Sequence, residues 1–260
     1  MTDATAPAAA NTSYPVRRIL ILIAAFAAPL IGYGQMALGL GMSPAEFSAQ
    51  GDSTLRVAGF AFTIWAVIYS WLLVYAVYQA LPSTTEGDLS RSLGWPSFFT
   101  LSGVGLWVVA SAANWEWATV AIIVASKLCL VLALYQLGTR WLSEPRRRQA
   151  LVVWPLGLLA GWLSIAALVN ILTVATSQGL ITPETANLWA LVAVGVAVVQ
   201  AIVVTWRTRI WTYPVPIAWG LIGAFFAQRT DGNDLLAFSA LGAAVVIIIG
   251  ATLILSRRRA

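Results

Sequence analysis

Residues 154–171, WPLGLLAGWLSIAALVNI, contain no charged side chain, and the uncharged apolar run around them covers about residues 150–175. A helix of about 20 apolar residues spans the roughly 30 Å hydrocarbon core of a bilayer. Backbone N–H and C=O groups in lipid must bond within the segment, which favours a helix over an isolated strand. We therefore predict a transmembrane helix at this position.

Seven further apolar stretches resemble this one in length and composition. With it, they lie at about 19–40, 57–81, 96–114, 117–139, 150–175, 186–206, 211–228 and 235–255. Sixty per cent of the residues are hydrophobic and ten per cent are charged, a balance typical of membrane proteins. We predict an all-α, polytopic transmembrane helix bundle of about eight spans. The weakest stretch is 211–228, which is short and contains Pro214 and Pro216.

The arginines predict how the chain is oriented. Threading all eight stretches from a cytoplasmic start puts twelve arginines on the inner side and only Arg56 and Arg229 on the outer side. Cationic loops remain cytoplasmic in most membrane proteins, so we predict a multi-pass protein of the cell membrane with both termini in the cytoplasm. Residues 1–18 are expected to form a disordered cytoplasmic tail. A seven-span threading leaves the C-terminal arginines outside and fits less well.

The composition lacks residues that several classes of protein function require. The chain has no histidine and one cysteine, Cys129, which removes the commonest metal ligand and the usual general base. We therefore predict no catalytic residues, no metal site and no enzymatic activity. The net charge of +5 arises from arginines at membrane flanks, so the bilayer is the expected partner and nucleic acid is not.

Thirteen tryptophans are a high number for 260 residues. Many lie near predicted span ends, as in an interfacial aromatic belt. Six lie at least a turn inside a span: Trp65, Trp71, Trp107, Trp154, Trp162 and Trp219. The set favours a wall for a flat hydrophobic ligand, and ordinary packing is the alternative at any single position.

Four passages together resemble a known family, in the family's own order. They are AAFAAPLIG (24–32), FAFTIWAVIYSWLLVYAVYQ (60–79), SAANWEWA (111–118) and WPLGLLAGWLSIAALVNI (154–171). They resemble the TspO/MBR family of tryptophan-rich sensory proteins over about residues 19–175. The resemblance implies a five-helix transmembrane core, often dimeric, so a homodimer is an expected partner. Residues 176–260 would add three helices outside that core.

The family resemblance also implies a ligand site. Proteins of this family bind porphyrins and other hydrophobic molecules between the helices, beneath the first loop. Carried over to matching positions, the pocket would be lined by Trp65, Tyr69, Asn114, Trp117, Trp162 and Asn170. The first loop here lacks the tryptophan that the family often places over its pocket, and the segment after residue 172 lacks the Tyr and basic residue associated with sterol binding.

Lys127 is the one basic residue inside a span, eleven residues from Glu116 and thirteen from Arg140. A cation at this depth costs about 2.5–3.5 kcal/mol on insertion scales, and all acidic residues lie in tails, loops or span ends. Three states remain open: a neutral lysine, a charged lysine hydrated beside Asn170, Asn114 or Gln35, and a lysine that pairs with an anionic ligand. We include Lys127 among the candidate ligand-binding residues.

The functional prediction is an integral membrane protein that binds a tetrapyrrole-like ligand in a tryptophan-lined pocket, with a sensory or transport role. A porphyrin or haem-like ligand would be held without histidine ligation, and no cofactor is otherwise expected. The alternatives are a secondary transporter of a small solute and a structural or assembly subunit. Light-dependent porphyrin degradation is an added activity that the resemblance leaves open.

Overall fold

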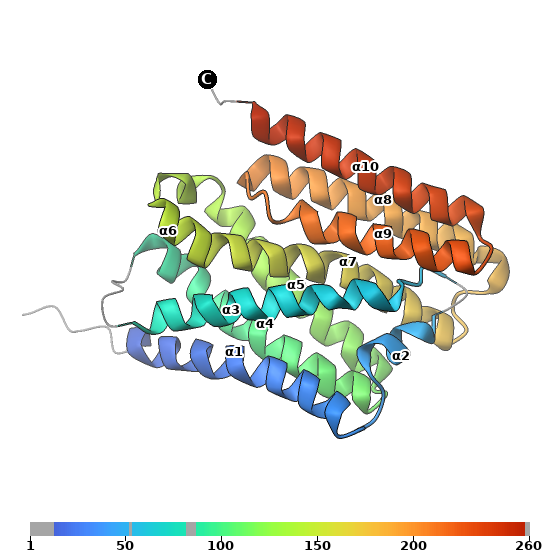
Figure 1. Ribbon diagram of the computed structural model, residues 1–260, viewed down its shortest axis with the longest axis horizontal. Helices are drawn as coiled ribbons and strands as arrows, with labels where there is room; N and C mark the ends of the chain where they lie inside the picture. Colours follow the sequence, from blue (N-terminus) through green and yellow to red (C-terminus); the bar gives the residue numbers. More distant parts are fainter. Residues whose placement is uncertain (1–12, 52–53, 82–86, 258–260) are drawn as a thin grey trace, which may run out of the picture.

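The computed structural model describes residues 13–51, 54–81 and 87–257, and all regular structure in these ranges is helical (Figure 1). Eight long helices follow the eight apolar stretches. They are α1 (Ser13–Ala37), α3 (Ile64–Ala80), α4 (Asp88–Ala112), α5 (Glu116–Leu137), α7 (Trp154–Ser177), α8 (Pro183–Thr208), α9 (Pro214–Thr230) and α10 (Asp234–Ser256). Five short elements connect them: α2 (Pro44–Ala49), the 3₁₀ turns η1 (Gly59–Thr63) and η2 (Arg140–Ser143), α6 (Arg146–Arg148) and a π-helical turn η3 (Gln149–Val153).

The predicted polytopic helix bundle is confirmed. Seven helical segments of the described chain are long and apolar enough to cross a membrane. The eighth, α9, has only 17 residues, as expected for the stretch that contains Pro214 and Pro216. It nevertheless runs beside α8 and α10 along the bundle (Figure 1). The start of α1, at Ser13, and the end of α10, at Ser256, lie at the same end of the molecule.

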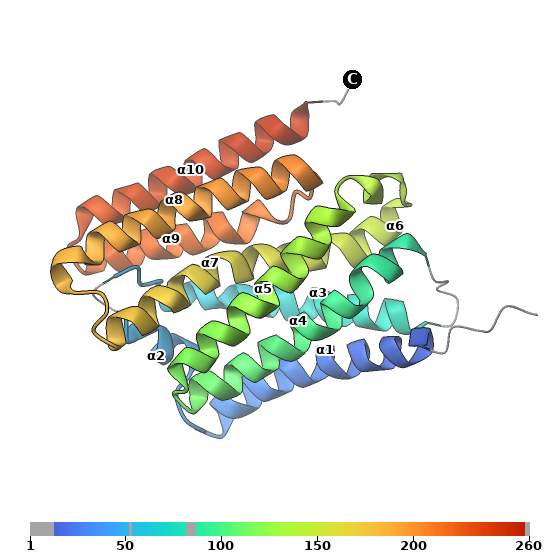
Figure 2. The same ribbon diagram turned by 180° about the vertical axis from the view of Figure 1, so that it is seen from behind.

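Five helices form a closed ring. α1 packs against α3 and α4, α4 against α5, α5 against α7, and α7 against α3. Helices α8, α9 and α10 form a second layer that covers α7 on the side away from α1 (Figure 2). α7 is thus surrounded on most sides, which explains why 17 of its 24 residues are buried although the helix is apolar over its whole surface.

Two predicted boundaries were wrong. The segment 13–18 was expected in a disordered tail, but α1 already begins at Ser13; residues 1–12 lie outside the described part. The stretch placed at about 96–114 begins earlier than expected, since the helix that contains it, α4, starts at Asp88 and continues through Pro96. A proline inside a membrane helix is tolerated where neighbouring groups satisfy the freed carbonyl.

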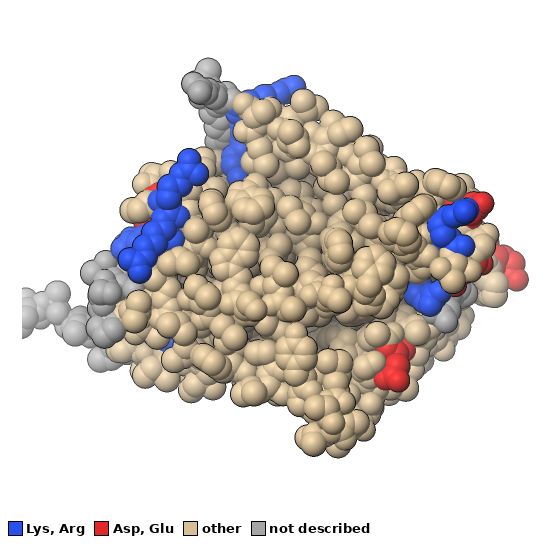
Figure 3. Space-filling view, in the orientation of Figure 1, with Lys and Arg blue, Asp and Glu red and all other residues tan. Residues whose placement is uncertain are grey.

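Most charged side chains lie toward the two ends of the bundle, and the flank between them that Figure 3 shows is uncharged. Lys127, in the middle of α5, lies away from both ends. One end, which we call the basic end, holds the start of α1 and α7 and the end of α5, α8 and α10, with most of the described arginines. The opposite end, which we call the lid end, holds α2, Arg56, Arg229 and nearby acidic residues. This separation is typical of a protein whose middle lies in lipid.

The segment before α3 is attached to α9, although about 160 residues separate them in the chain. The backbone N–H of Ala58 donates to the carbonyl of Gly223 (3.1 Å), and Trp219 Nε1 donates to the carbonyl of Ala61 (2.9 Å). Gln228 Nε2 donates to the carbonyl of Thr54 (2.9 Å), and Arg56 pairs with Asp231. The C-terminal layer therefore holds the end of the first loop in place.

Candidate functional site

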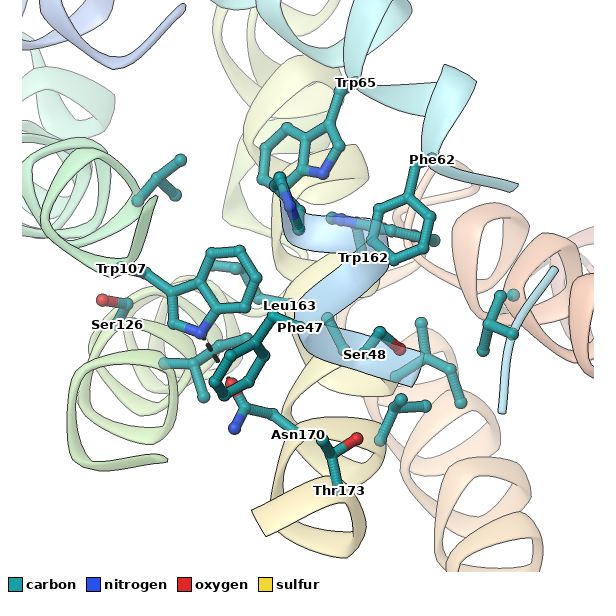
Figure 4. A pocket seen from close by; sticks show the side chains of 18 of the residues that line it. Phe47, Ser48, Phe62, Trp65, Trp107, Ser126, Trp162, Leu163, Asn170 and Thr173 are labelled. Carbon is teal, nitrogen blue, oxygen red and sulfur yellow. Dashed lines mark hydrogen bonds between the residues drawn. The ribbon is translucent and has the colours of Figure 1, made fainter. Parts of the chain in front are cut away.

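An apolar cavity lies inside the five-helix ring near the lid end. Its walls come from α2, η1, α3, α4, α5 and α7, with Gly220 of α9 at one side. Five aromatic side chains line it (Figure 4): Phe47, Phe62, Trp65, Trp107 and Trp162. The polar side chains that reach it are those of Ser48, Ser126, Asn170 and Thr173, and no charged residue is among the described residues that line it.

The aromatic rings meet edge to face. The ring centroids of Trp65 and Trp162 are 6.1 Å apart at an interplanar angle of 83°, and those of Phe62 and Trp162 are 6.2 Å apart at 81°. On the other side, Phe47 and Trp107 are 6.1 Å apart at 83°. Such edge-to-face pairs are a favoured aromatic geometry. These three contacts join the five rings in two groups, which form the aromatic part of the cavity wall.

Asn170 joins three helices beside the cavity. Trp107 Nε1 on α4 donates to Asn170 Oδ1 (2.6 Å), while Asn170 Nδ2 on α7 donates to Thr119 Oγ1 on α5 (2.9 Å). Both groups of the amide are therefore occupied. Asn170 positions the Trp107 ring in the wall, and these two bonds use one of its two N–H donors and one of the two lone pairs of Oδ1.

Two polar atoms in the cavity wall are buried without a hydrogen bond in the described chain. They are Trp162 Nε1 and Ser48 Oγ. Trp162 is only 4% exposed, so bulk water does not satisfy its N–H group. A buried donor left unpaired costs about 1–3 kcal/mol. The cavity thus offers a hydrogen-bond donor that the described fold itself does not use.

The short helix α2 covers the cavity. It begins with a capping box, in which the Glu46 backbone N–H donates to Ser43 Oγ (3.2 Å) and the Ser43 N–H donates to Glu46 Oε2 (2.7 Å). Phe47 projects from α2 into the cavity and is 1% exposed. Behind it the chain lies directly on α7, since a Cβ on Gly51 would be 2.7 Å from Thr173 Cα. These contacts make α2 a tightly seated lid.

The cavity is narrow while this lid is in place. Its empty space is about 700 Å³ when crevices and the opening are included, but a water-sized sphere can place its centre in only about 50 Å³ of it. The smaller volume decides what fits without rearrangement, and it corresponds to a few water molecules. A ring system of tetrapyrrole size requires Phe47 or the whole of α2 to move.

The structure brings together three of the predicted site residues, because Trp65, Trp162 and Asn170 all line the cavity. Tyr69 lies one turn below Trp65 and stacks on it at 4.9 Å, behind the wall. Asn114 lies in the exposed turn between α4 and α5, with a φ of 54°. The same turn leaves Trp117 pointing outward, 54% exposed.

Lys127 is half-buried on α5 but does not line the cavity. Its neighbour Ser126 does, and consecutive residues on a helix point about 100° apart. In the part of the chain that the structure describes, no hydrogen bond joins Lys127 to Asn170, Asn114 or Gln35. Asn170 is occupied by Trp107 and Thr119, and the Gln35 amide nitrogen binds carbonyls of the first loop.

Six aromatic or polar wall residues were not predicted for the site: Phe47, Ser48, Phe62, Trp107, Ser126 and Thr173. Trp107 had a signal, because it was one of the six interior tryptophans. Phe47 also had one, as a large apolar residue placed directly after the capping-box pattern Ser43-Pro44-Ala45-Glu46 in an otherwise polar loop. Within the described ranges, no group of three or more His, Cys, Asp or Glu side chains is arranged to hold a metal ion.

The fold and the cavity define an integral membrane protein with an aromatic chamber between its helices. A family model described as TSPO-like protein matches residues 18–253, so the chain belongs to the TSPO-like family. The match extends beyond residue 175 and includes α8, α9 and α10, which the resemblance in the sequence had left outside. Comparisons with curated proteins and with solved structures gave no match.

Proposed function

We propose that this protein binds a flat, hydrophobic, tetrapyrrole-like ligand in the aromatic cavity and serves in sensing or transporting it. The observation that carries the proposal is the Trp162 N–H group, buried among aromatic rings without an acceptor in the described chain. A ligand with a carbonyl or ring-nitrogen acceptor at its edge would remove this unpaired donor while its faces stack on Trp65 and Trp107. Ligand pockets commonly combine apolar walls with a few such polar groups.

The ligand edge inside the cavity should be uncharged. No charged side chain lines the cavity among the described residues, and Lys127 lies outside it. Placing a carboxylate there would remove its hydration without providing a cation, which is strongly unfavourable. We therefore propose that any acidic groups of the ligand remain at the lid end or are esterified. The proposed role is binding, without a catalytic step.

The test is a fluorescence titration of the protein in lipid nanodiscs with protoporphyrin IX dimethyl ester. Trp162→Phe keeps an aromatic ring but removes the N–H group, so the Kd should rise about fivefold to tenfold, the value of one hydrogen bond of about 1 kcal/mol. Trp206→Phe is the matched control, because Trp206 is 60% exposed on α8. Equal affinities of the two variants, or no saturable binding to the wild type, would contradict the proposal.

A second pair of titrations tests the charge of the ligand. Lys127→Met should leave the affinities for protoporphyrin IX and for its dimethyl ester unchanged, because Lys127 does not reach the cavity wall. If Lys127→Met selectively weakens the free acid, Lys127 meets a ligand carboxylate in the bound state. That result would refute an uncharged ligand edge while leaving ligand binding itself intact.

A further inference from the structure

A second hollow lies on the flank of the bundle, in a groove between α1 and α4 near the lid end. It shares no lining residue with the aromatic cavity. About 510 Å³ of it is open to the centre of a water-sized sphere, roughly the size of pockets that hold small molecules. Both helices that form it are long and apolar enough to cross a membrane, so we expect the groove to open toward lipid.

The walls of the groove are apolar except for one side chain. Leu30 and Val109 form its rim and are 70% and 45% exposed. Among the described residues that line it, none is charged, and the single polar side chain is that of Gln35. Gln35 is 8% exposed although it lies only two residues before the end of α1.

In the side-chain amide of Gln35, the nitrogen is hydrogen-bonded and the oxygen is not, within the residues that the structure describes. Its Nε2 donates to the carbonyls of Leu40 (2.6 Å) and Met42 (3.1 Å), with a longer contact to Gly41. Carbonyl oxygens can only accept hydrogen bonds, so the side-chain amide of Gln35 must be oriented with its nitrogen toward the first loop. Gln35 Oε1 is buried and accepts no hydrogen bond from the residues that the structure describes.

The groove is built into the fold and has a fixed end. Met42 N–H donates to the carbonyl of Ala112 (3.2 Å), which attaches the first loop to the end of α4. Gly41 adopts a φ of 69°, and a Cβ on it would lie 2.1 Å from Ala112 O. On the floor, by contrast, a Cβ on Gly34 would meet no atom within 4 Å. The missing side chain at Gly34 therefore leaves space that a bound molecule can fill.

We propose that this groove binds a lipid alcohol, whose apolar body lies over Gly34 and whose hydroxyl donates to Gln35 Oε1. The occupant must bring a donor, because the free polar atom is an acceptor. It should bring few other polar groups, since Gln35 Nε2 is already used and an ester carbonyl would find no donor. An anionic headgroup has no cation to meet among the described lining residues. The site is independent of the proposed function of the aromatic cavity.

The test uses a photoactivatable 18-carbon alcohol with a diazirine in its chain, and its methyl ether, which lacks the O–H donor. Each is added to the wild-type protein in nanodiscs, illuminated, and located by peptide mass spectrometry. The alcohol should label residues 30–41 and 108–113 about fivefold more than the ether, as expected for one buried hydrogen bond of about 1 kcal/mol.

Gly34→Leu fills the groove and should abolish this labelling. Gly195→Leu is the matched control, because Gly195 is exposed on α8 and a Cβ there also meets no atom within 4 Å. Denaturation of the Gly34→Leu variant in mixed detergent micelles, compared with that of the wild type, reports separately on whether the bundle is folded. Equal labelling by alcohol and ether, as water on Gln35 or ordinary boundary lipid would give, overturns the proposal. Undiminished labelling of a folded Gly34→Leu variant does the same.

Discussion

Asn170 shows how much one polar side chain can organise inside a membrane bundle. It connects α4, α5 and α7 through Trp107 and Thr119. Asn170→Leu keeps the size of the side chain but leaves the Trp107 N–H group without its acceptor. We expect the free energy of unfolding to fall by about 1–3 kcal/mol, measured by denaturation in mixed detergent micelles.

Thr119→Val is the graded control for this prediction. It removes the hydrogen bond from Asn170 Nδ2, together with the local bond that Thr119 Oγ1 donates to the Glu116 carbonyl (2.6 Å), and leaves the Trp107–Asn170 bond intact. Interhelical hydrogen bonds in membranes contribute about 0.6 kcal/mol on average, so the loss should be smaller. An Asn170→Leu protein as stable as the wild type would show that the bridge contributes nothing to the fold.

At the same scale, depth within a predicted span favoured Trp107 for the cavity wall, whereas the family resemblance favoured Trp117. Trp107 and Trp117 both lie near the turn between α4 and α5, and the family-like passage drew attention to Trp117. The positive φ at Asn114 reverses the chain within a few residues. As a result Trp117 faces outward while Trp107, two turns back on α4, faces the cavity.

Among the elements, α7 makes close contacts through two residues that lack a side chain, Gly157 and Gly161. A Cβ on Gly161 would lie 2.0 Å from the Tyr213 carbonyl oxygen, and one on Gly157 would lie 2.4 Å from a methyl carbon of Ile210. The four-residue glycine spacing thus permits close approach of the segment that leads into α9. Spacing of this kind is visible in the sequence, but the partner is not.

Gly161→Ala should therefore destabilise the protein. The added methyl group meets backbone rather than a flexible side chain, so overpacking should cost about 1–3 kcal/mol, measured by the same detergent denaturation. Gly195→Ala, at an exposed position on α8 with open space around it, should be neutral or slightly stabilising. Equal behaviour of the two variants would mean that α7 and the α9 segment are not in close contact.

The turn η3 has a local cause that the sequence contains. Pro155 has no N–H group, so in a π-helical pattern the carbonyl five residues earlier, that of Ala150, receives no hydrogen bond from it. The preceding turn is π-helical from Gln149 to Val153. The Ala150 carbonyl within it accepts a hydrogen bond from Trp71 Nε1 at 3.0 Å. A proline on α7 thus creates an attachment point for α3.

The lid helix α2 should respond to acid. The pKa of the Glu46 carboxyl is lowered from its ordinary value of 4.5, first by the hydrogen bond from the Ser43 backbone N–H. A carboxyl with a lowered pKa in the folded state stabilises that state above its ordinary pKa and loses this contribution as the pH falls through the lowered value. The capping box should therefore weaken below about pH 4.5, releasing Phe47.

Hydrogen exchange, normalised to intrinsic rates, measures this effect. The backbone amides of residues 46–48 should lose protection as the pH falls below 4.5, the ordinary pKa of a glutamate carboxyl. Glu46→Ala should show the low protection already at neutral pH and little further change with acid. Acid-dependent loss of the same size in Glu46→Ala would exclude Glu46 as the cause.

On the scale of the whole molecule, the end of the bundle that holds most of the described arginines is also the end where α1 begins and α10 ends. The described ends of α1 and α10 lie at the basic end, and this end is expected to face the cytoplasm. In a Cys129→Ala background, a membrane-impermeant maleimide added to intact cells should label Thr182→Cys at the lid end. It should label Ser143→Cys at the basic end only after the cells are opened. The reverse pattern would invert the proposed orientation.

The number, order and approximate extent of the long helices could be predicted because lipid imposes them. Each span must be long, apolar and internally hydrogen-bonded. The length and hydrophobicity of a stretch can be recognised directly in the sequence. The sorting of arginines toward one end follows from the same cause. The helical stretch around 211–228 was correctly singled out as the weakest, and it became the 17-residue α9.

Only the tertiary structure decided which faces of these helices meet. In a soluble protein an apolar stripe reveals the inward face of a helix, but these spans are apolar on all sides, so their rotation leaves little trace in the sequence. The rotation of each helix is set instead by close contacts at glycines, where no side chain keeps the neighbouring backbone away, as at Gly161 and Gly41. That is why Trp65 and Trp162 came to share a cavity with Phe47 and Trp107, and why the first loop is attached to α9.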